Sequence, residues 1–180
     1  MSDLIKADIK AVTEALVKDA NRIRLAAMNP LKGDISRRVF QQGTSTDGSP
    51  IGQYATSTKK FRNLVGRRID KVDLQMLGTL KDSLIVGESE NRVVMGISEV
   101  PEVQGKASKH RKGGFATLQV GKKTDFTTVE NAITQEKHFN KSIFAPSDQE
   151  VDKSLKNFDR EFKKTTDKAL GGNKTIKIKK

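Results

Sequence analysis

The feature that most constrains this chain is a tight turn followed by a basic run and a branched apolar segment, all within residues 46–86. Asp47-Gly48 next to Ser49-Pro50 predicts a tight loop, because glycine readily adopts positive φ and proline fixes φ. The stretch from Leu77 to Val86 is rich in branched apolar side chains, which suit a half-buried strand. None of these residue types suggests bond-making chemistry. The segment therefore predicts a sheet behind an ordered, basic loop.

Long helices are predicted at both ends of the chain. Apolar residues three or four apart in residues 3–28 predict an amphipathic helix. Asn29-Pro30 is expected to end it, since the residue before proline is disfavoured in the α region, and Asp34 would cap a second, short helix. Ser147 to Glu150 forms a capping-box sequence, and the helix behind it is expected to stop at Gly171-Gly172. The apolar stripe of this last helix is Val151, Leu155, Phe158, Phe162 and Ala169, with Thr165 in the same stripe.

Between these helices the sequence predicts strands and loops. Residues 83–87 and 92–98 flank a polar connection of hairpin length, and residues 115–120 form a third candidate strand. The segment 101–114 combines glycine with lysine, arginine and histidine, so it is expected to be a mobile basic loop. Thr56 or Ser57 would cap one more short helix.

The fold class that these elements predict is α+β. We expect a small antiparallel sheet, of roughly three to five strands, packed by the long N- and C-terminal helices. Basic extended loops and a lysine-rich tail complete the prediction. Residues 1–170 would form a single domain. Residues 171–180 would form a flexible basic tail that is either disordered or orders as a strand against a partner.

A series of short motifs resembles the tail-completion and neck proteins of tailed bacteriophages. The matching pieces are Phe40, the Asp47-Gly48-Ser49-Pro50 turn, Thr58-Lys59-Lys60, Leu77-Gly78-Thr79-Leu80 with Ser83-Leu84, and Val93 to Ile97. A later piece, from His138-Phe139 to Ser147 and the following helix, resembles the closing segment of that family. The sequence departs from the family at Ile51-Gly52, where a tryptophan often follows the proline.

The resemblance implies a structural role at the phage head–tail junction, as a neck, tail-completion or tail-terminator protein. The chain would form a homo-oligomeric ring and would contact other neck, portal-adaptor or tail-tube proteins, and also, non-specifically, the DNA in the channel. It would be assembled in the host cytoplasm and reside in the virion. The candidates for contact with partners or DNA are basic residues: Lys59, Lys60, Arg62, Arg67, Arg68, Lys106, Lys109, Arg111, Lys112, Lys122, Lys123, Lys174, Lys177, Lys179 and Lys180.

The overall charge agrees with a polyanionic partner. The 180 residues carry a formal net charge of +12, with 34% hydrophobic and 5% aromatic residues. Such a charge favours binding to nucleic acid, to an acidic protein surface or to a membrane face, and the alternative is that it serves solubility alone. No apolar run approaches the ~18 residues of a membrane span, so no membrane contact is expected.

Catalytic and cofactor motifs are absent from the sequence. There is no cysteine, and the only two histidines, His110 and His138, lie in different segments. No phosphate-binding, dinucleotide-binding or zinc-hydrolase motif is present. The acidic residues at Asp148, Glu150 and Asp152 suit the first turn of a helix better than a metal. We therefore expect no enzymatic activity, no metal and no cofactor.

The alternative function is a basic nucleic-acid-binding protein of the ribosome-associated kind. The charge favours it. The scarcity of aromatic residues argues against a stacking platform for single strands, since Tyr54 is the only tyrosine and there is no tryptophan. No predicted helix carries a one-sided basic face that would enter a groove.

Overall fold

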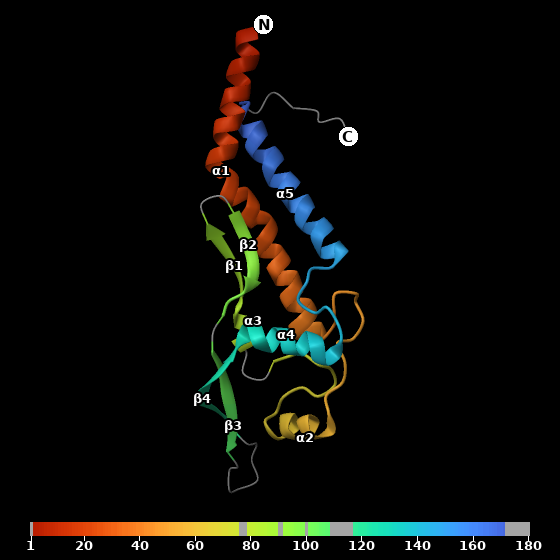
Figure 1. The fold of residues 1–180 in the computed structure, drawn as a ribbon. Coiled ribbons are helices and arrows are strands. Elements are labelled where there is room, and N and C mark those ends of the chain that lie inside the picture. Colours follow the sequence, from red (N-terminus) through yellow and green to blue (C-terminus); the bar gives the residue numbers. More distant parts are fainter. Residues whose placement is uncertain (1, 76–78, 90–91, 100, 109–116, 172–180) are drawn as a thin grey trace. The chain divides into compact units, whose positions relative to one another are not determined.

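The computed structural model describes residues 2–75, 79–89, 92–99, 101–108 and 117–171 (Figure 1), and for residues 2–7, 89, 101–108 and 117–126 it describes the backbone alone. The fold is α+β, as predicted, with long N- and C-terminal helices and small two-stranded sheets. The chain divides into two compact units, each described below by itself. Unit 1 comprises Met1–Leu31, Val86–Val94 and Asp148–Lys180, and unit 2 comprises Lys32–Ile85 and Met95–Ser147.

The N-terminal helix is longer than predicted. Helix α1 spans Ser2–Ser36 and contains Pro30 in its interior, so Asn29-Pro30 does not end it and Asp34 does not begin a new helix. A proline inside a helix costs about 3 kcal/mol. The helix continues because Leu31 and Ile35 extend its apolar stripe and are 7% and 0% exposed. Burial of one such side chain contributes about 1.5–3 kcal/mol, which offsets the cost of the proline.

After α1 the chain continues as a wider, π-helical turn, which ends at a glycine. The π-helix η1 spans Arg37–Gln42 and buries Val39 and Phe40. Gly43 follows it with φ of +70°, and its N–H donates to the carbonyl of Arg38. A β-carbon at Gly43 would lie 2.5 Å from the carbonyl oxygen of Val72. Only glycine therefore fits between the end of this helix and the segment that packs on it.

In unit 1, the C-terminal helix α5, Asp148–Ala169, runs alongside α1 (Figure 1). The hydroxyl of Ser154 donates to the carbonyl oxygen of Ala27 at 3.1 Å. Closer to the N-terminus of α1, the guanidinium of Arg22 donates to Glu161 at 2.9 Å and to Thr165 at 2.8 Å, both of which follow Ser154 on α5. These contacts pair an early residue of one helix with a late residue of the other, so the two helices are antiparallel.

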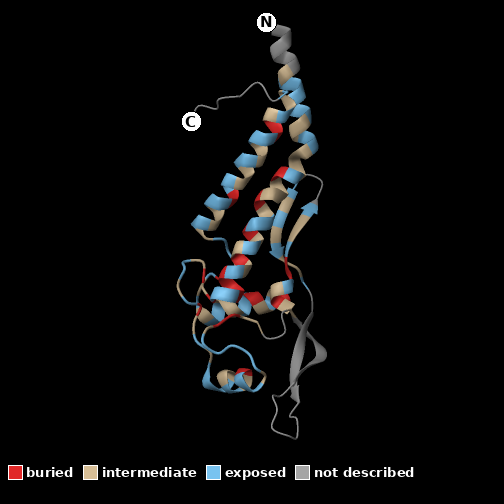
Figure 2. Ribbon diagram, turned by 180° about the vertical axis from the view of Figure 1, so that it is seen from behind, coloured by how far each residue is buried: buried red, intermediate tan, exposed pale blue. Residues whose placement is uncertain are grey.

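The face that α5 buries differs in part from the predicted stripe. Thr165 is buried, as predicted, but Ser154 and Thr166 are buried outside the stripe, and Leu155 within it is 56% exposed. Phe158 and Phe162 are half-buried, and their rings stack at 6.2 Å between centroids. In Figure 2 the helix is accordingly mostly pale blue and tan. Small side chains let α5 approach α1 closely and leave part of the apolar stripe at the surface.

The predicted boundaries of α5 are confirmed. It begins at Asp148, which places Ser147 at the predicted N-cap position. At the other end Gly171 has φ of +74°, and its N–H donates to the carbonyl of Lys168 at 3.2 Å. This is the left-handed termination that glycine favours.

Unit 2 has a core assembled from many short segments. Helix α4, Thr128–Phe139, contributes Ala132, and the short helices α2, Thr56–Leu64, and α3, Thr79–Asp82, lie earlier in the chain. The segment predicted as the start of a strand at residues 79–82 is thus helical. Figure 2 shows the buried residues of this unit in red around the C-terminal end of α1 and around α4. The fully or nearly buried apolar residues are Ile35, Val39, Phe40, Ile51, Val72, Leu80, Leu84, Ala132 and Ile143.

The described strands form two separate pairs. β1, Leu84–Ser89, pairs with β2, Arg92–Ile97, as the predicted hairpin. β3, Pro101–Ser108, pairs antiparallel with β4, Thr117–Thr127. Residues 101–108 are therefore a strand and not the predicted loop, and the third predicted strand is longer than expected. The remaining part of that loop, residues 109–114, lies outside the described residues.

Candidate functional site

The predicted turn is held together by its own aspartate. One carboxylate oxygen of Asp47 accepts from the hydroxyls of Ser45 and Ser49, both at 2.6 Å, and from the amide of Ser49 at 2.9 Å. These hydrogen bonds, foremost those of the two hydroxyls, hold the pKa of Asp47 well below its usual range. The ammonium of Lys141 donates to Ser49 at 2.5 Å and to the carbonyl of Pro50 at 2.6 Å. All four polar side chains thus serve to fix the turn.

A buried arginine fastens the closing segment of unit 2. The guanidinium of Arg38, in η1, donates to the carbonyls of Ile143 at 2.9 Å and Ala145 at 2.7 Å. Glu136, on α4, accepts from the amide of Ile143 at 2.7 Å. Sequence patterns gave no indication of Arg38, because these two carbonyls lie more than 100 residues away in the chain. The residues from 143 to 145, which carry part of the family resemblance, are therefore fixed by ionic side chains that bind backbone.

A second buried arginine corrects the prediction for the basic run. Arg62, on α2, is 2% exposed, so it does not face a partner or DNA as predicted. Its guanidinium donates to the carboxylate of Asp73 at 2.8 Å and to the carbonyls of Arg68 at 2.7 Å and Gln75 at 3.0 Å. The guanidinium carbon also lies 4.4 Å from the ring centre of Tyr54. A buried guanidinium requires partners for its charge and its donors, and here these partners all lie within the protein.

Tyr54 and Asp73 complete this cluster. The phenol of Tyr54 donates to Asp73 at 3.0 Å and accepts from the amide of Asp73 at 3.1 Å. Burial raises the pKa of Tyr54 to about 12, and the negative charge of Asp73 contributes to this increase. The cluster therefore holds α2 against the segment that follows it, and the phenol of Tyr54 stays neutral.

The other cations of the basic run remain at the surface of unit 2. Lys60, Arg67 and Arg68 are exposed and Lys59 is half-buried. Arg68 pairs with Asp70 at 3.0 Å, an ion pair that solvent weakens. This segment, α2 and the residues that follow it, gathers four of the predicted candidates and is named the α2 basic surface below.

The remaining candidates fall on β3 and β4 or outside the described residues. Lys106 stands opposite Gln119 in the ladder, and Lys123 stands opposite Val103, while Lys122 lies on β4. The structure brings these lysines onto one strand pair, which the sequence presented as two loops. The candidates outside the described residues are Lys109, Arg111, Lys112, Lys174, Lys177, Lys179 and Lys180.

Neither the histidines nor the acidic residues form a ligand set in the described part of the chain. Within those residues there is no group of three or more histidine, cysteine, aspartate or glutamate side chains that could hold a metal. His138 is exposed, with its ring edge-on to Phe139 at 4.7 Å between centroids. His110 lies outside the described residues.

No helix among the described residues has the length and apolar character that a bilayer crossing requires. Comparison with known proteins gives no relative: no protein-family model, no curated protein and no solved structure matches this chain.

Proposed function

We propose that this chain is a structural protein of the head–tail junction of a tailed bacteriophage, acting as a neck, tail-completion or tail-terminator subunit in a ring. The proposal rests on one observation: the residues of the motifs that resemble that family stabilise the fold of unit 2. Phe40, Leu80 and Leu84 are buried in the core of unit 2, and Asp47 holds the turn. Motifs that fix a fold, and not a reaction centre, are what a structural family shares.

The same arrangement supports a role without catalysis. The ionic side chains of Arg38, Asp47, Arg62 and Glu136 are all engaged with backbone groups, and Arg62 also pairs with Asp73. A general acid or base needs a titratable group that reaches a substrate. These four groups are committed to local structure, and we propose that the protein is not an enzyme.

The proposed partners are acidic surfaces of neighbouring neck, portal-adaptor or tail-tube subunits, and DNA phosphates in the channel. The α2 basic surface supplies exposed cations for either contact. A ring uses heterologous contacts, so each subunit presents two different surfaces that fit each other. Virion location follows from this role.

The competing function, binding of nucleic acid by a monomer, is favoured by the net charge of +12 alone. The two functions differ in where the protein is found. In the proposed function the chain is part of a particle, and its contacts with DNA are incidental to a protein assembly. In the competing function, nucleic acid is the main partner and its binding weakens steeply with salt.

The experiment that tests the proposal is labelling of purified particles with an antibody against this chain, followed by electron microscopy. The expected result is gold at the single vertex where the tail joins the head, or at the end of the tail. A matched control uses particles made without the chain, which should lack both the label and a complete junction. Label on ribosomes or free nucleic acid, with none on particles, would overturn the proposal.

A further inference from the structure

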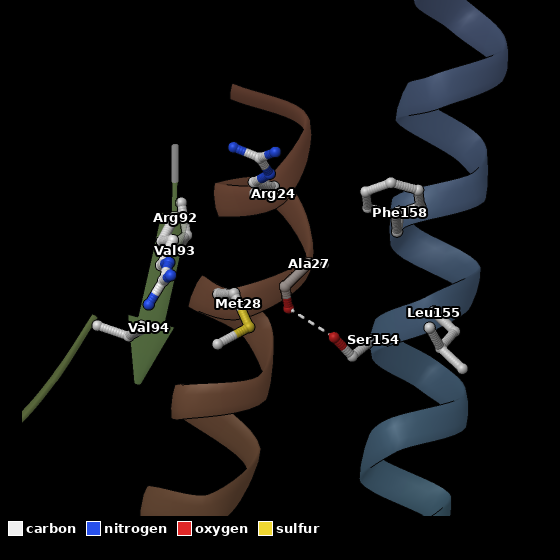
Figure 3. Close-up of a pocket in the computed structure, with 9 residues that line it drawn as sticks. All are labelled: Arg24, Ala27, Met28, Arg92, Val93, Val94, Ser154, Leu155 and Phe158. Carbon is white, nitrogen blue, oxygen red and sulfur yellow. Dashed lines mark hydrogen bonds between the residues drawn. The ribbon is translucent and has the colours of Figure 1, made fainter. Parts of the chain in front are cut away.

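Unit 1 contains an open, largely apolar hollow that the proposed ring does not explain. It holds about 430 Å³ and is bounded by α1, β2 and α5 (Figure 3). Met28 of α1, Val94 of β2, and Leu155 and Phe158 of α5 are among the side chains that line it. Val94 and Leu155 are 57% and 56% exposed. Large apolar side chains are therefore left facing solvent at the edge of a concave surface, which is typical of an interaction site.

Two arginines supply the charge of the hollow. Among its nine lining residues, Arg24 of α1 and Arg92 of β2 are cationic and none is acidic. Figure 3 shows Arg24 on the turn of α1 next to the one that carries Met28, and Arg92 on the strand side. Arg24 makes one long hydrogen bond, at 3.3 Å to Asn21, and Arg92 is exposed. Both guanidinium groups retain donors that an incoming carboxylate would satisfy.

The remaining polar group of the hollow is already engaged. The hydroxyl of Ser154 donates its proton to the carbonyl of Ala27 at 3.1 Å, across the contact between α1 and α5. It therefore serves the helix pair and does not offer a donor to a ligand. What the hollow offers to a ligand is therefore apolar surface together with the two guanidinium groups.

We propose that this hollow docks an acidic, amphipathic segment of a partner protein. Apolar side chains of that segment would contact Met28, Leu155 and Phe158, and flanking carboxylates would pair with Arg24 and Arg92. A guanidinium matches a carboxylate with two parallel hydrogen bonds, which gives both charge and geometric specificity. An apolar centre with a polar edge is the usual anatomy of a protein interface. The proposal stands on the hollow itself and does not depend on the phage assignment.

A protein segment fits this site better than a small molecule. A small-molecule site usually covers about 70–90% of the surface of its ligand. Here two of the lining side chains are more than half exposed, so an occupant would keep one side in solvent. An amphipathic segment has such a polar side. Met28 also adapts its shape to different apolar partners, because its side chain is unbranched and flexible.

The test is selection from a random library of 12-residue peptides displayed on yeast, against the full chain. The expected consensus has apolar residues three or four apart with aspartate or glutamate beside them. Selected peptides should bind the double variant Arg24→Glu/Arg92→Glu at least tenfold more weakly, and Leu155→Ser should also weaken them. The matched control is Lys18→Glu/Lys163→Glu, which makes the same charge change at exposed positions of α1 and α5 outside the hollow and should bind as the parent does.

Three results would overturn the proposal. Selected peptides could be basic, they could bind the Arg24→Glu/Arg92→Glu variant as well as the parent, or no peptide could be enriched while sodium laurate binds in an arginine-dependent way. The last result would assign the hollow to an anionic amphiphile. Thermal unfolding of each variant shows whether it is folded, and if the double reversal is not, Arg92→Gln with Leu155→Ser provides the same comparison.

Discussion

At the residue scale, the described basic side chains include two groups, those that are buried and bind within the protein and those that are exposed at its surface. Arg62 lies within a basic run and was predicted to face a partner. In the structure its guanidinium instead donates hydrogen bonds to Asp73 and to two backbone carbonyls. The sequence could not indicate this, because the partner is 11 residues away and lies outside the helix that carries Arg62. Lys60, Arg67 and Arg68, which lack such a pocket, remain exposed as predicted.

The titration of Tyr54 tests this cluster directly. It is the only tyrosine, so absorbance near 295 nm reports it alone. We expect a midpoint of about 12 in the folded protein, against ~10 in denaturant. Because the folded-state pKa is raised, the stability that the neutral phenol contributes is present below pH ~10 and is lost as the pH rises to about 12. Tyr54→Phe should remove this part of the alkaline loss. A folded-state midpoint near 10 would mean that the phenol is solvated.

Among the described glycines, Gly43 combines a positive φ with the shortest contact that an added β-carbon would make. Gly43→Ala would place a β-carbon 2.5 Å from the backbone oxygen of Val72, and its φ of +70° is strained for alanine. Gly48→Ala is the matched control, since Gly48 has φ of +80° with open space around it. We expect both to lose about 1–2 kcal/mol from strain, and Gly43→Ala a further ~1–3 kcal/mol from the clash. Urea unfolding measures the two. Equal losses would show that the end of η1 is not packed on residue 72.

At the element scale, periodicity and capping predicted the long helices, and tertiary packing set their limits. The stop at Gly171 follows from local chemistry, so the sequence was sufficient. The continuation of α1 through Pro30 depends on burial of Leu31 and Ile35, which no local rule reveals. Helix α4 was missed although its signal was present. Thr127 and Glu130 form a reciprocal capping box, with distances of 3.3 and 2.8 Å.

Strand β3 was missed for a different reason. Its sequence, with proline, glycine and lysine, has low intrinsic strand preference. The ladder with β4 supplies backbone hydrogen bonds whatever the side chains, and its register shifts near Val103 accommodate the irregular sequence. Pairing of this kind depends on a partner strand and cannot be seen in one segment alone.

The proline in α1 offers a test of helix continuity. Pro30→Ala restores the N–H donor and removes the clash with the preceding turn, so we expect a gain of about 1–3 kcal/mol in the free energy of unfolding. Gly33→Ala, three residues later, has nothing within 4 Å of the new β-carbon and should gain up to about 1 kcal/mol. Circular dichroism during urea unfolding measures both. A gain in Gly33→Ala combined with a loss in Pro30→Ala would contradict a continuous helix.

At the scale of the whole molecule, the α+β class was predictable, but the division of the chain was not. Neither compact unit is a continuous stretch, because α1, β1 and β2 each pass from one unit into the other. The prediction of one domain over residues 1–170 stays a prediction, since units that share elements need not be separable. The sequence located the turn and the basic run of the candidate site. The closed contacts of Arg38 and Arg62, and the hollow in unit 1, required the structure.

The proposed function makes this chain a ring-forming structural protein. Its most direct test is the native mass of the assembly that contains it, purified through an affinity tag from cells that produce it and measured by native mass spectrometry. If the chain forms a closed ring, the expected mass is a discrete multiple of the 19.9 kDa subunit, with no nucleic acid after a wash in high salt. A single copy that carries RNA, with no multiple of the subunit at any concentration, would contradict it.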